Sequence, residues 1–123
     1  MKILVVGSNG LVGSACKKVF SNSKKVTELV TSTRKDTDLF NFEQTKKLIG
    51  STEPDVLIIA AAKVGGIYAN NTQRVDFLIE NLKINSNLLE ACIDYPNIKI
   101  INLGSSCIYP LNASNPISEN EFM

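Results

Sequence analysis

The sequence predicts an α/β fold with one parallel β-sheet and helices on both faces of the sheet. Three observations lead to this prediction: strand-like and helical segments alternate, most of the expected strands are short apolar runs, and a glycine-spaced turn joins the first strand to the first helix. Short apolar runs bounded by turn residues are typical of strands that are buried on both faces. Parallel strands need crossover connections, which the intervening helices supply.

Composition limits the function classes that need to be considered. The 123 residues suffice for one domain with one core, and 44% hydrophobic and 20% charged residues are ordinary for a globular protein. A net charge of +1 without a basic block gives no indication of a nucleic-acid or membrane partner. No apolar run approaches the ~20 residues of a membrane span, and no secretory leader is visible, so we expect a cytoplasmic protein.

The cysteine and histidine content excludes several chemistries. Cys16, Cys92 and Cys107 lack metal-binding spacing, so we expect free thiols and no metal site. Cys16 and Cys92 fall on helical apolar stripes, which predicts a packing role for both. The chain contains no histidine, which excludes Ser-His catalysis and histidine-metal chemistry carried by this chain alone.

The opening stretch, residues 2–15, predicts a strand, a tight turn and a helix. Glycines at positions 7, 10 and 13 follow an apolar run and precede residues at helical spacing. Gly7 suits a positive φ, Gly10 admits a diphosphate close to the backbone, and Gly13 allows the helix to pack tightly on the strand. The exposed N–H groups at the start of the helix would then face phosphates. The pattern favours a Rossmann-type dinucleotide-binding turn, with a purely structural glycine turn as the alternative. The other turn residues assigned to this site are Asn9, Leu11 and Val12.

The second expected strand, Val26 to Thr31, bears on the choice of cofactor. An acidic residue at its end would bind the ribose hydroxyls of NAD, but positions 31 to 34 are Thr-Ser-Thr-Arg. Arg34 and the neighbouring hydroxyls suit a 2′-phosphate, because a guanidinium binds phosphate bidentately. The stretch therefore favours NADP(H) over NAD, and the alternative is that Arg34 is a solvated surface charge.

The next segment predicts a short strand that ends at Leu39 and then a helix. Asn41 suits the cap of a helix from Phe42 to about Ile49, and Gly50 is expected to end it. The carboxylate of Asp38 suits a turn or a cap.

A further apolar strand, Val56 to Ala60, leads into three alanines. Small residues at the carboxyl end of a central strand, here Ala60, Ala61 and Ala62, leave room for a ligand, although close packing is an alternative. A loop from Lys63 to Asn71 then precedes a long helix from about Thr72 to Tyr95. Its wide apolar arc suits the helix–sheet core, with a second subunit or another helix as alternatives.

The last expected strand, Ile98 to Leu103, leads into the sequence GSSCIYP and then a polar, turn-like tail. A serine after a strand, Ser105, can hydrogen-bond a substrate carbonyl or hydroxyl. A thiol at Cys107 can exchange a proton with a carbon acid. The alternative for both residues is a structural turn.

Two stretches carry a resemblance to a known family. AAKVGGIYAN and LGSSCIYP together resemble the GDP-L-fucose synthases of the extended short-chain dehydrogenase/reductase family, and GLVGSA, TRKDTDL and ENLKINSNLL support the resemblance. The resemblance implies an NADPH-dependent epimerase/reductase that converts GDP-4-keto-6-deoxy-mannose to GDP-L-fucose. It implies that Ser105 is the serine of a Ser-Tyr-Lys set and that Cys107 is the acid/base of the epimerisation. It further implies that Asp38 and Leu39 contact the adenine.

The chain departs from this family in two respects. Asn9 stands where the family usually has an arginine that holds the 2′-phosphate. The family is also considerably longer, so the chain resembles its amino-terminal part, with residues 1–123 as a partial NAD(P)-binding Rossmann domain that lacks the substrate domain. The one tyrosine with a lysine four residues on, Tyr95, is followed by Pro96, which separates it from Lys99.

We therefore expect this chain to bind its cofactor without turnover of the GDP-linked sugar. Family members commonly form homodimers through the long helix, and whether this chain does so stays open. The alternatives are a non-catalytic NADP-binding or interaction module, and an NAD-dependent epimerase or dehydratase that acts on another nucleotide sugar.

Overall fold

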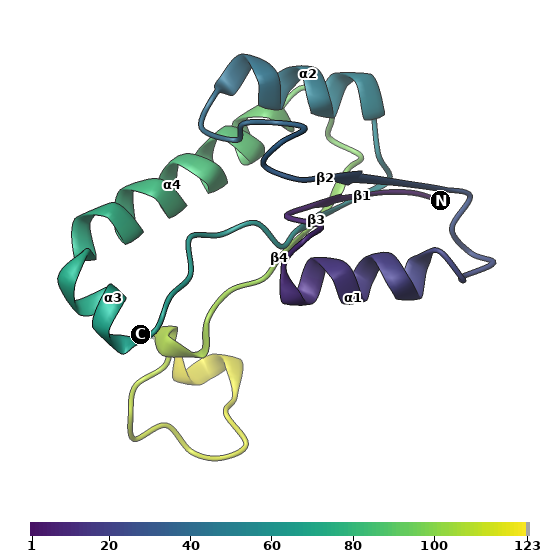
Figure 1. The fold of residues 1–123 in the computed structure, drawn as a ribbon. Coiled ribbons are helices and arrows are strands. Elements are labelled where there is room, and N and C mark those ends of the chain that lie inside the picture. Colours follow the sequence, from purple (N-terminus) through teal and green to yellow (C-terminus); the bar gives the residue numbers. More distant parts are fainter. Residues whose placement is uncertain (123) are drawn as a thin grey trace.

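A sheet of four parallel strands forms the centre of the molecule (Figure 1). The computed structural model describes residues 1–122, apart from the side chain of Ser106. The strands are β1 (Lys2–Val6), β2 (Glu28–Ser32), β3 (Val56–Ile59) and β4 (Lys99–Asn102), and their spatial order is β2-β1-β3-β4. All three neighbouring pairs are parallel, which confirms the predicted sheet.

Helices cover the sheet on both faces, as predicted. Figure 1 shows α1 (Leu11–Phe20) on one side, and α2 (Phe42–Thr52) and α4 (Arg74–Ala91) on the other. A short helix, α3 (Ile67–Thr72), leads into α4, and two 3₁₀ turns, Ser106–Ile108 and Glu119–Glu121, follow β4. Among residues 1–122, no helix combines the length and the apolar character needed to cross a membrane.

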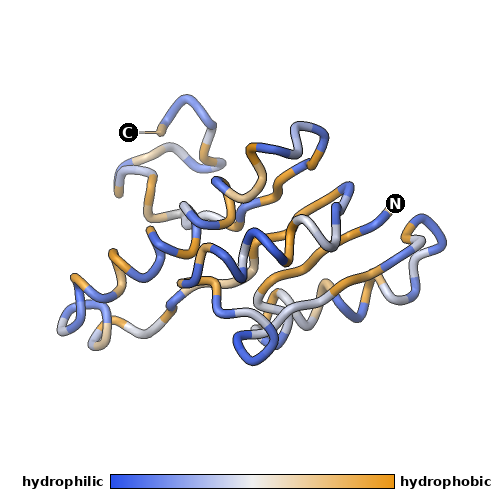
Figure 2. The backbone as a smooth tube through the Cα atoms, turned by 90° about the horizontal axis from the view of Figure 1, so that it is seen from above, coloured by the Kyte–Doolittle hydropathy of each residue, from blue (hydrophilic) through white to orange (hydrophobic). Residues whose placement is uncertain are grey.

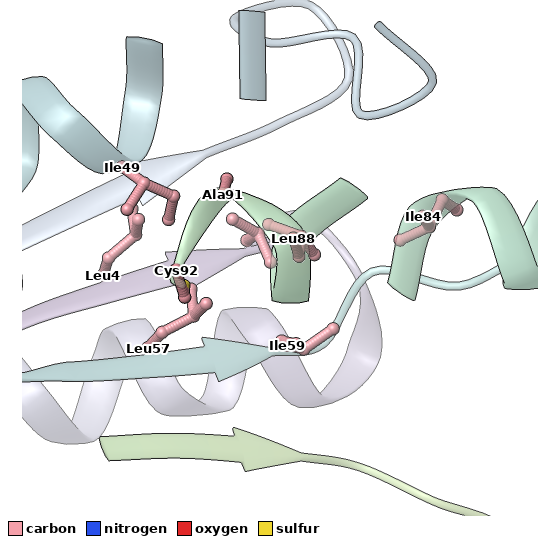
Figure 3. Close-up of a cluster of buried hydrophobic side chains, with 9 residues drawn as sticks. Leu4, Ile49, Leu57, Ile59, Ile84, Leu88, Ala91 and Cys92 are labelled. Atoms are coloured by element: carbon pink, nitrogen blue, oxygen red, sulfur yellow. The ribbon is translucent and has the colours of Figure 1, made fainter. Parts of the chain in front are cut away.

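The strands divide their side chains between two cores. Leu4 and Leu57 are completely buried on the face of α2 and α4, where Ile49, Leu88 and Cys92 pack against them (Figure 3). The intervening residues Ile3, Val5 and Ile58 face α1. Figure 2 shows hydrophobic residues concentrated along the strands and hydrophilic residues at many of the turns. Burying one leucine side chain contributes about 1.5–3 kcal/mol, so the central strands stabilise the fold most.

The predicted strand that ends at Leu39 is wrong, because the structure has turns there. The Phe40 N–H donates to Asp38 Oδ1 at 3.0 Å, and the Asp38 N–H donates to Gln44 Oε1 at 3.0 Å. Side chains thus satisfy backbone groups that a strand would have paired with a neighbour. The predicted cap of α2 is confirmed, since Asn41 Oδ1 accepts the Gln44 N–H at 3.1 Å.

Two other predicted boundaries are wrong. Gly50 does not end α2, which continues to Thr52 and is followed by Glu53 in the left-handed region. Gly50 instead accommodates Tyr95, whose hydroxyl would lie 2.8 Å from an added Cβ. The helix predicted over 72–95 is shorter, because α4 spans only Arg74–Ala91, and the separate helix α3 (Ile67–Thr72) occupies part of the predicted loop.

The apolar arc of α4 is only partly covered. Ile84 and Leu88 are buried against the sheet, whereas Val75, Leu78 and Leu82 are exposed. The predicted helix–sheet core is confirmed for the buried part of the arc.

Candidate functional site

A cavity of about 590 Å³ lies along the carboxyl edge of the sheet. The segments that follow β1, β2 and β3 line it, together with one face of α4. Nine of the residues that the sequence assigned to a cofactor line this cavity: Gly7, Asn9, Gly10, Arg34, Asp38, Leu39, Ala60, Ala61 and Ala62. The other three, Leu11, Val12 and Gly13, form the first turn of α1 directly after Gly10.

The glycine turn after β1 has the predicted conformation. Gly7 has a φ of +77°, and an added Cβ there would lie 2.5 Å from the Ala61 nitrogen. A Cβ on Gly13 would lie 2.2 Å from the Gly7 carbonyl oxygen, so α1 can approach the turn this closely only with glycine. At Gly10 a Cβ would meet only two carbonyl oxygens, at 3.3 and 4.0 Å, and would otherwise stand in open space.

The first turn of α1 offers unpaired N–H groups. The Gly10 N–H donates to the Gly7 carbonyl, and the Ser14 N–H donates to the Gly10 carbonyl. Within the described part of the chain, the N–H groups of Leu11, Val12 and Gly13 have no protein acceptor. The helix has neither a side-chain cap nor an acidic residue in this turn. Free N–H groups at the positive end of a helix bind anions.

Three hydrogen bonds fasten the glycine turn to the end of β2. The Ser32 carbonyl accepts the N–H of Gly7 at 3.0 Å, the N–H of Ser8 at 3.1 Å and the Ser8 hydroxyl at 3.2 Å. Ser8 is almost completely buried. These bonds fix the distance between the start of α1 and the loop that follows β2.

The loop after β2 presents two cations to the cavity. Asp36 Oδ2 accepts the Thr33 N–H at 2.8 Å and the Thr33 hydroxyl at 2.7 Å, and these bonds hold the pKa of the Asp36 carboxyl below its ordinary value. Arg34 and Lys35 are exposed and line the cavity, and the described residues supply no salt-bridge partner for either. The Arg34 guanidinium lies 5.4 Å from the centre of the Phe40 ring. The loop therefore lines the cavity with two cations and one carboxylate, that of Asp38.

The loop after β3 forms a salt bridge with α4 at the cavity. Lys63 Nζ lies 2.6 Å from Glu80 Oε1 of α4 and 5.3 Å from the centre of the Phe77 ring. Lys63, Glu80 and other lining residues were not predicted from the sequence, because α4 and the turns meet there only in the fold. The missed residues are Lys35, Thr37, Phe40, Lys63, Glu80 and Ile84. Lys63 directly follows the alanines at the end of β3, a position that could have identified it.

Comparison with known proteins identifies the family. Residues 3–122 match the family model described as "NAD dependent epimerase/dehydratase family". The chain belongs to the NAD dependent epimerase/dehydratase family. It is 38% identical over 122 residues to GDP-L-fucose synthase from Escherichia coli, a match that covers 99% of this chain and 38% of the relative. It is 40% identical over 122 residues to GDP-L-fucose synthase 1 from Arabidopsis thaliana, with the same coverage of both chains.

A solved relative of this epimerase/dehydratase chain has the same fold. The NADP-bound GDP-L-fucose synthetase from Naegleria fowleri superimposes with a TM-score of 0.82 at 31% identity, over 98% of this chain and 39% of that chain. The resemblance to GDP-L-fucose synthases and the Rossmann-type fold are thus confirmed. The chain spans 38% of the length of both curated relatives.

Ser105 and Cys107 of this epimerase/dehydratase chain lie outside the cavity. Both follow β4 and are exposed, and neither is among the lining residues. Ser105 Oγ accepts the Cys107 N–H at 3.2 Å, and the Ser105 carbonyl accepts the Ile108 N–H at 3.3 Å. The two side chains thus belong to one turn but do not share the cavity with the residues after β1, β2 and β3.

The three cysteines are free thiols in different surroundings. Cys92 is buried beside Leu57, and this burial raises the pKa of its thiol. Cys16 is half-buried against the α1 face of the sheet, so both have the predicted packing role, whereas Cys107 is exposed. Over the residues described, no group of three His, Cys, Asp or Glu side chains could hold a metal ion.

Proposed function

We propose that this chain binds NADP(H) as the cofactor part of an epimerase/reductase that acts on a GDP-linked 4-keto-6-deoxy sugar, converting GDP-4-keto-6-deoxy-mannose to GDP-L-fucose. One observation carries the proposal: the first turn of α1, directly after the lining residue Gly10, has three unpaired N–H groups, and the loop after β2 lines the same cavity with two cations that have no salt-bridge partner among the described residues. A 2′-phosphorylated dinucleotide carries a diphosphate and a phosphate monoester, which match these two sets of groups. The similarity to GDP-L-fucose synthases supports the choice of substrate.

The residues present fit this cofactor. The cavity volume falls within the range of small-molecule sites, and no acidic side chain lies in the first turn of α1, where a diphosphate would bind. Asn9 brings no charge to the turn, but Lys35 adds a second cation beside Arg34. This second cation supports NADP(H) over NAD, since guanidinium and ammonium groups both bind phosphate.

Each part of the cavity then has a role. The N–H groups of α1 hold the diphosphate, Arg34 holds the 2′-phosphate, Asp38 and Leu39 border the adenine, and the alanines after β3 leave room for the rest of the dinucleotide. NADPH would supply the hydride for the reduction. Outside the cavity, and only with further protein to enclose the sugar, Ser105 would donate a hydrogen bond to its carbonyl and Cys107 would exchange a proton with the adjacent carbon.

A second candidate, an NADP-binding module without catalysis, is favoured by the position of Ser105 and Cys107. Both are exposed and outside the cavity, so protein beyond this chain would have to enclose a substrate next to them. The chain also lacks a tyrosine and lysine one helical turn apart, and a general acid of that kind contributes roughly 10² to 10⁴-fold to a rate. We therefore expect this chain to bind cofactor without turning over the sugar.

Calorimetric titration of the chain with NADPH and NADH, side by side, tests the proposal. We expect NADPH to bind at least about tenfold more tightly, the factor that one charge-assisted hydrogen bond supplies. Arg34→Ala removes this preference, whereas Lys24→Ala, which removes an exposed cation far from the cavity, leaves it. Absence of binding at millimolar NADPH, or equal losses for both nucleotides in Arg34→Ala, contradicts the proposal. Oxidation of NADPH after addition of the GDP-linked sugar would exclude the non-catalytic module.

A further inference from the structure

Three asparagines of α4 each hydrogen-bond to a different part of the sheet edge. One contact lies after β2, one after β3 and one at the end of β4. Asn87 Nδ2 donates to the Leu39 carbonyl, after β2, at 2.8 Å. Asn81 binds Lys63, after β3, and Asn85 Oδ1 accepts Asn102 Nδ2, at the end of β4, at 3.2 Å. One helix thus contacts the segments that follow β2 and β3, and the last residue of β4, through the same type of side chain.

We propose that Asn81 and Asn87 are positioning residues, which hold the two side walls of the nucleotide cavity at a fixed separation. The proposal rests on the function proposed above and assigns a role to two residues that do not themselves line the cavity. The wall after β2 contains Leu39, and the wall after β3 contains the alanines and Lys63.

Asn81 replaces a missing strand neighbour for Lys63. The Lys63 N–H donates to Asn81 Oδ1 at 2.8 Å, and Asn81 Nδ2 donates to the Lys63 carbonyl at 3.0 Å. The same Nδ2 donates to the Phe77 carbonyl of α4 at 2.8 Å, which fixes the amide plane. Because β3 ends at Ile59, Lys63 has no ladder partner, and the asparagine amide satisfies both of its backbone groups.

Asn87 acts on the other wall. The turn from Asp38 to Phe40 is otherwise held by hydrogen bonds within residues 38–44, all of them local in sequence. Asn87 supplies a bond that connects this turn to a distant element, since 48 residues separate Asn87 from Leu39. Leu39 and Phe40 also pack against the core cluster that contains Ile84 and Leu88, so this bond adds a directional link to the apolar contact between the turn and the core.

The helix between the two asparagines is anchored in the core. Ile84 and Leu88 of α4 are buried and belong to the same core cluster as Leu57 and Ile59 of the sheet (Figure 3). Six residues of helix rise about 9 Å, so α4 acts as a rigid spacer between the attachment points at Asn81 and Asn87. A cavity with walls fixed before the ligand arrives binds more tightly, because the ligand need not order them.

The order of the strands predicts a different effect for each asparagine. The wall after β2 borders the adenosine 2′-phosphate half of the ligand, whereas the wall after β3 lies on the far side of β1 and borders the remainder. Asn87→Ala should therefore weaken both NADPH and its fragment adenosine 2′,5′-bisphosphate, each by about tenfold. Asn81→Ala should weaken NADPH by about tenfold and the fragment less than about twofold.

The titrations use the whole chain at a temperature where every variant is folded, with Ser86→Ala as the matched control. Ser86 is exposed on the same helix, and its hydroxyl donates only to the Lys83 carbonyl of that helix. If the two asparagines had only a structural role, replacing them would lower the melting temperature and weaken the binding of both ligands to the same extent. The inference is overturned if Asn81→Ala weakens the binding of NADPH and of the fragment equally. It is also overturned if either asparagine variant binds both ligands as Ser86→Ala does.

Amide hydrogen exchange of the ligand-free chain tests the same bonds independently of nucleotide binding. In Asn81→Ala the Lys63 amide should exchange at least about tenfold faster, and in Asn87→Ala the faster exchange should be confined to residues 38–41. If the unmodified chain binds no nucleotide, the proposed function fails, and exchange alone decides the inference about the walls. Unchanged exchange at Lys63 in Asn81→Ala, or at residues 38–41 in Asn87→Ala, overturns it.

Discussion

Two regions of the carboxyl edge of the sheet differ in how firmly they are held. The segments after β1, β2 and β3 are joined by hydrogen bonds between elements, such as the three donors on the Ser32 carbonyl and the paired bonds between Asn81 and Lys63. In the segment after β4, Gly104, Ser105, Cys107 and Ile108 are exposed, and the hydrogen bonds described within it are local to one turn. We refer to these as the cavity region and the β4 segment.

The comparison shows that a position at the carboxyl edge is not sufficient to form a site. All four strands are parallel, so their ends meet at the same edge, yet only three of them contribute to the cavity. The difference is that α4 contributes a wall to the cavity region through Glu80 and Ile84. Neither Ser105 nor Cys107 lines the cavity. The cofactor half of the proposed site is thus built within this chain, whereas the β4 segment offers reactive side chains without an enclosing wall.

The largest expected effect is the difference in stability between an alanine substitution at a glycine of the cavity region and one at a glycine of the β4 segment. In Gly13→Ala the new Cβ would stand 2.2 Å from the Gly7 oxygen and 2.8 Å from the Ser8 Cα, which are backbone atoms that cannot rotate away. We expect a loss of about 3 kcal/mol in the free energy of unfolding, measured by urea denaturation, together with loss of NADPH binding. In Gly104→Ala nothing lies within 4 Å of the new Cβ, so the change should stay within about 0.5 kcal/mol. Equal stability of the two variants would show that the contact after β1 is not tight.

A smaller expected effect is a difference in the rate at which the thiols of Cys107 and Cys92 are alkylated. Cys107 is exposed, whereas Cys92 is 6% exposed and has a pKa raised by burial, which lowers its reactive thiolate fraction at neutral pH. We expect iodoacetamide to modify Cys107 at least about tenfold faster than Cys92, as followed by peptide mass spectrometry. NADPH should not protect Cys107, because this residue lies outside the cavity. Protection by NADPH would place the β4 segment in the nucleotide site, contrary to the structure.

Most of the fold could be predicted because its signals are local. The apolar runs at Ile3 and Val56 identify strands buried on both faces, and the structure places β1 and β3 there. The errors arose where side chains decide the local conformation. Leu39 lies in a turn because the Asp38 and Gln44 side chains bind backbone N–H groups that a strand would have paired, and Gly50 lies inside α2, where the Tyr95 hydroxyl approaches it. The apolar pattern from which the elements were predicted does not contain such contacts.

The candidate site shows the same limit. Lining residues such as Gly10 and Ala61 were predicted because the ends of parallel strands meet at one edge of a sheet. Glu80 and Phe40 were missed because the packing of α4 and of a turn brings them to the cavity. The motif that contains Ser105 and Cys107 identifies reactive residues, but their exposure depends on which segments cover β4, and a motif does not contain this information.

The smallest expected effect is a pH dependence within the cavity region. Thr33 donates two hydrogen bonds to the Asp36 carboxylate, the hydroxyl being the larger cause, and holds its pKa below the ordinary value of 3.8. Because the folded pKa is the lower one, these bonds stabilise the folded state fully above about pH 3.8, and this stabilisation is lost as the pH falls through the folded pKa. Stability should therefore not vary between pH 7 and 5 on account of this group. In an NMR titration from about pH 6 to 2, Thr33→Ala should move the midpoint of Asp36 back toward 3.8. Lys35→Ala, which removes the weaker charge effect, should move it less, and a larger shift in Lys35→Ala would show that charge rather than hydrogen bonding sets this pKa.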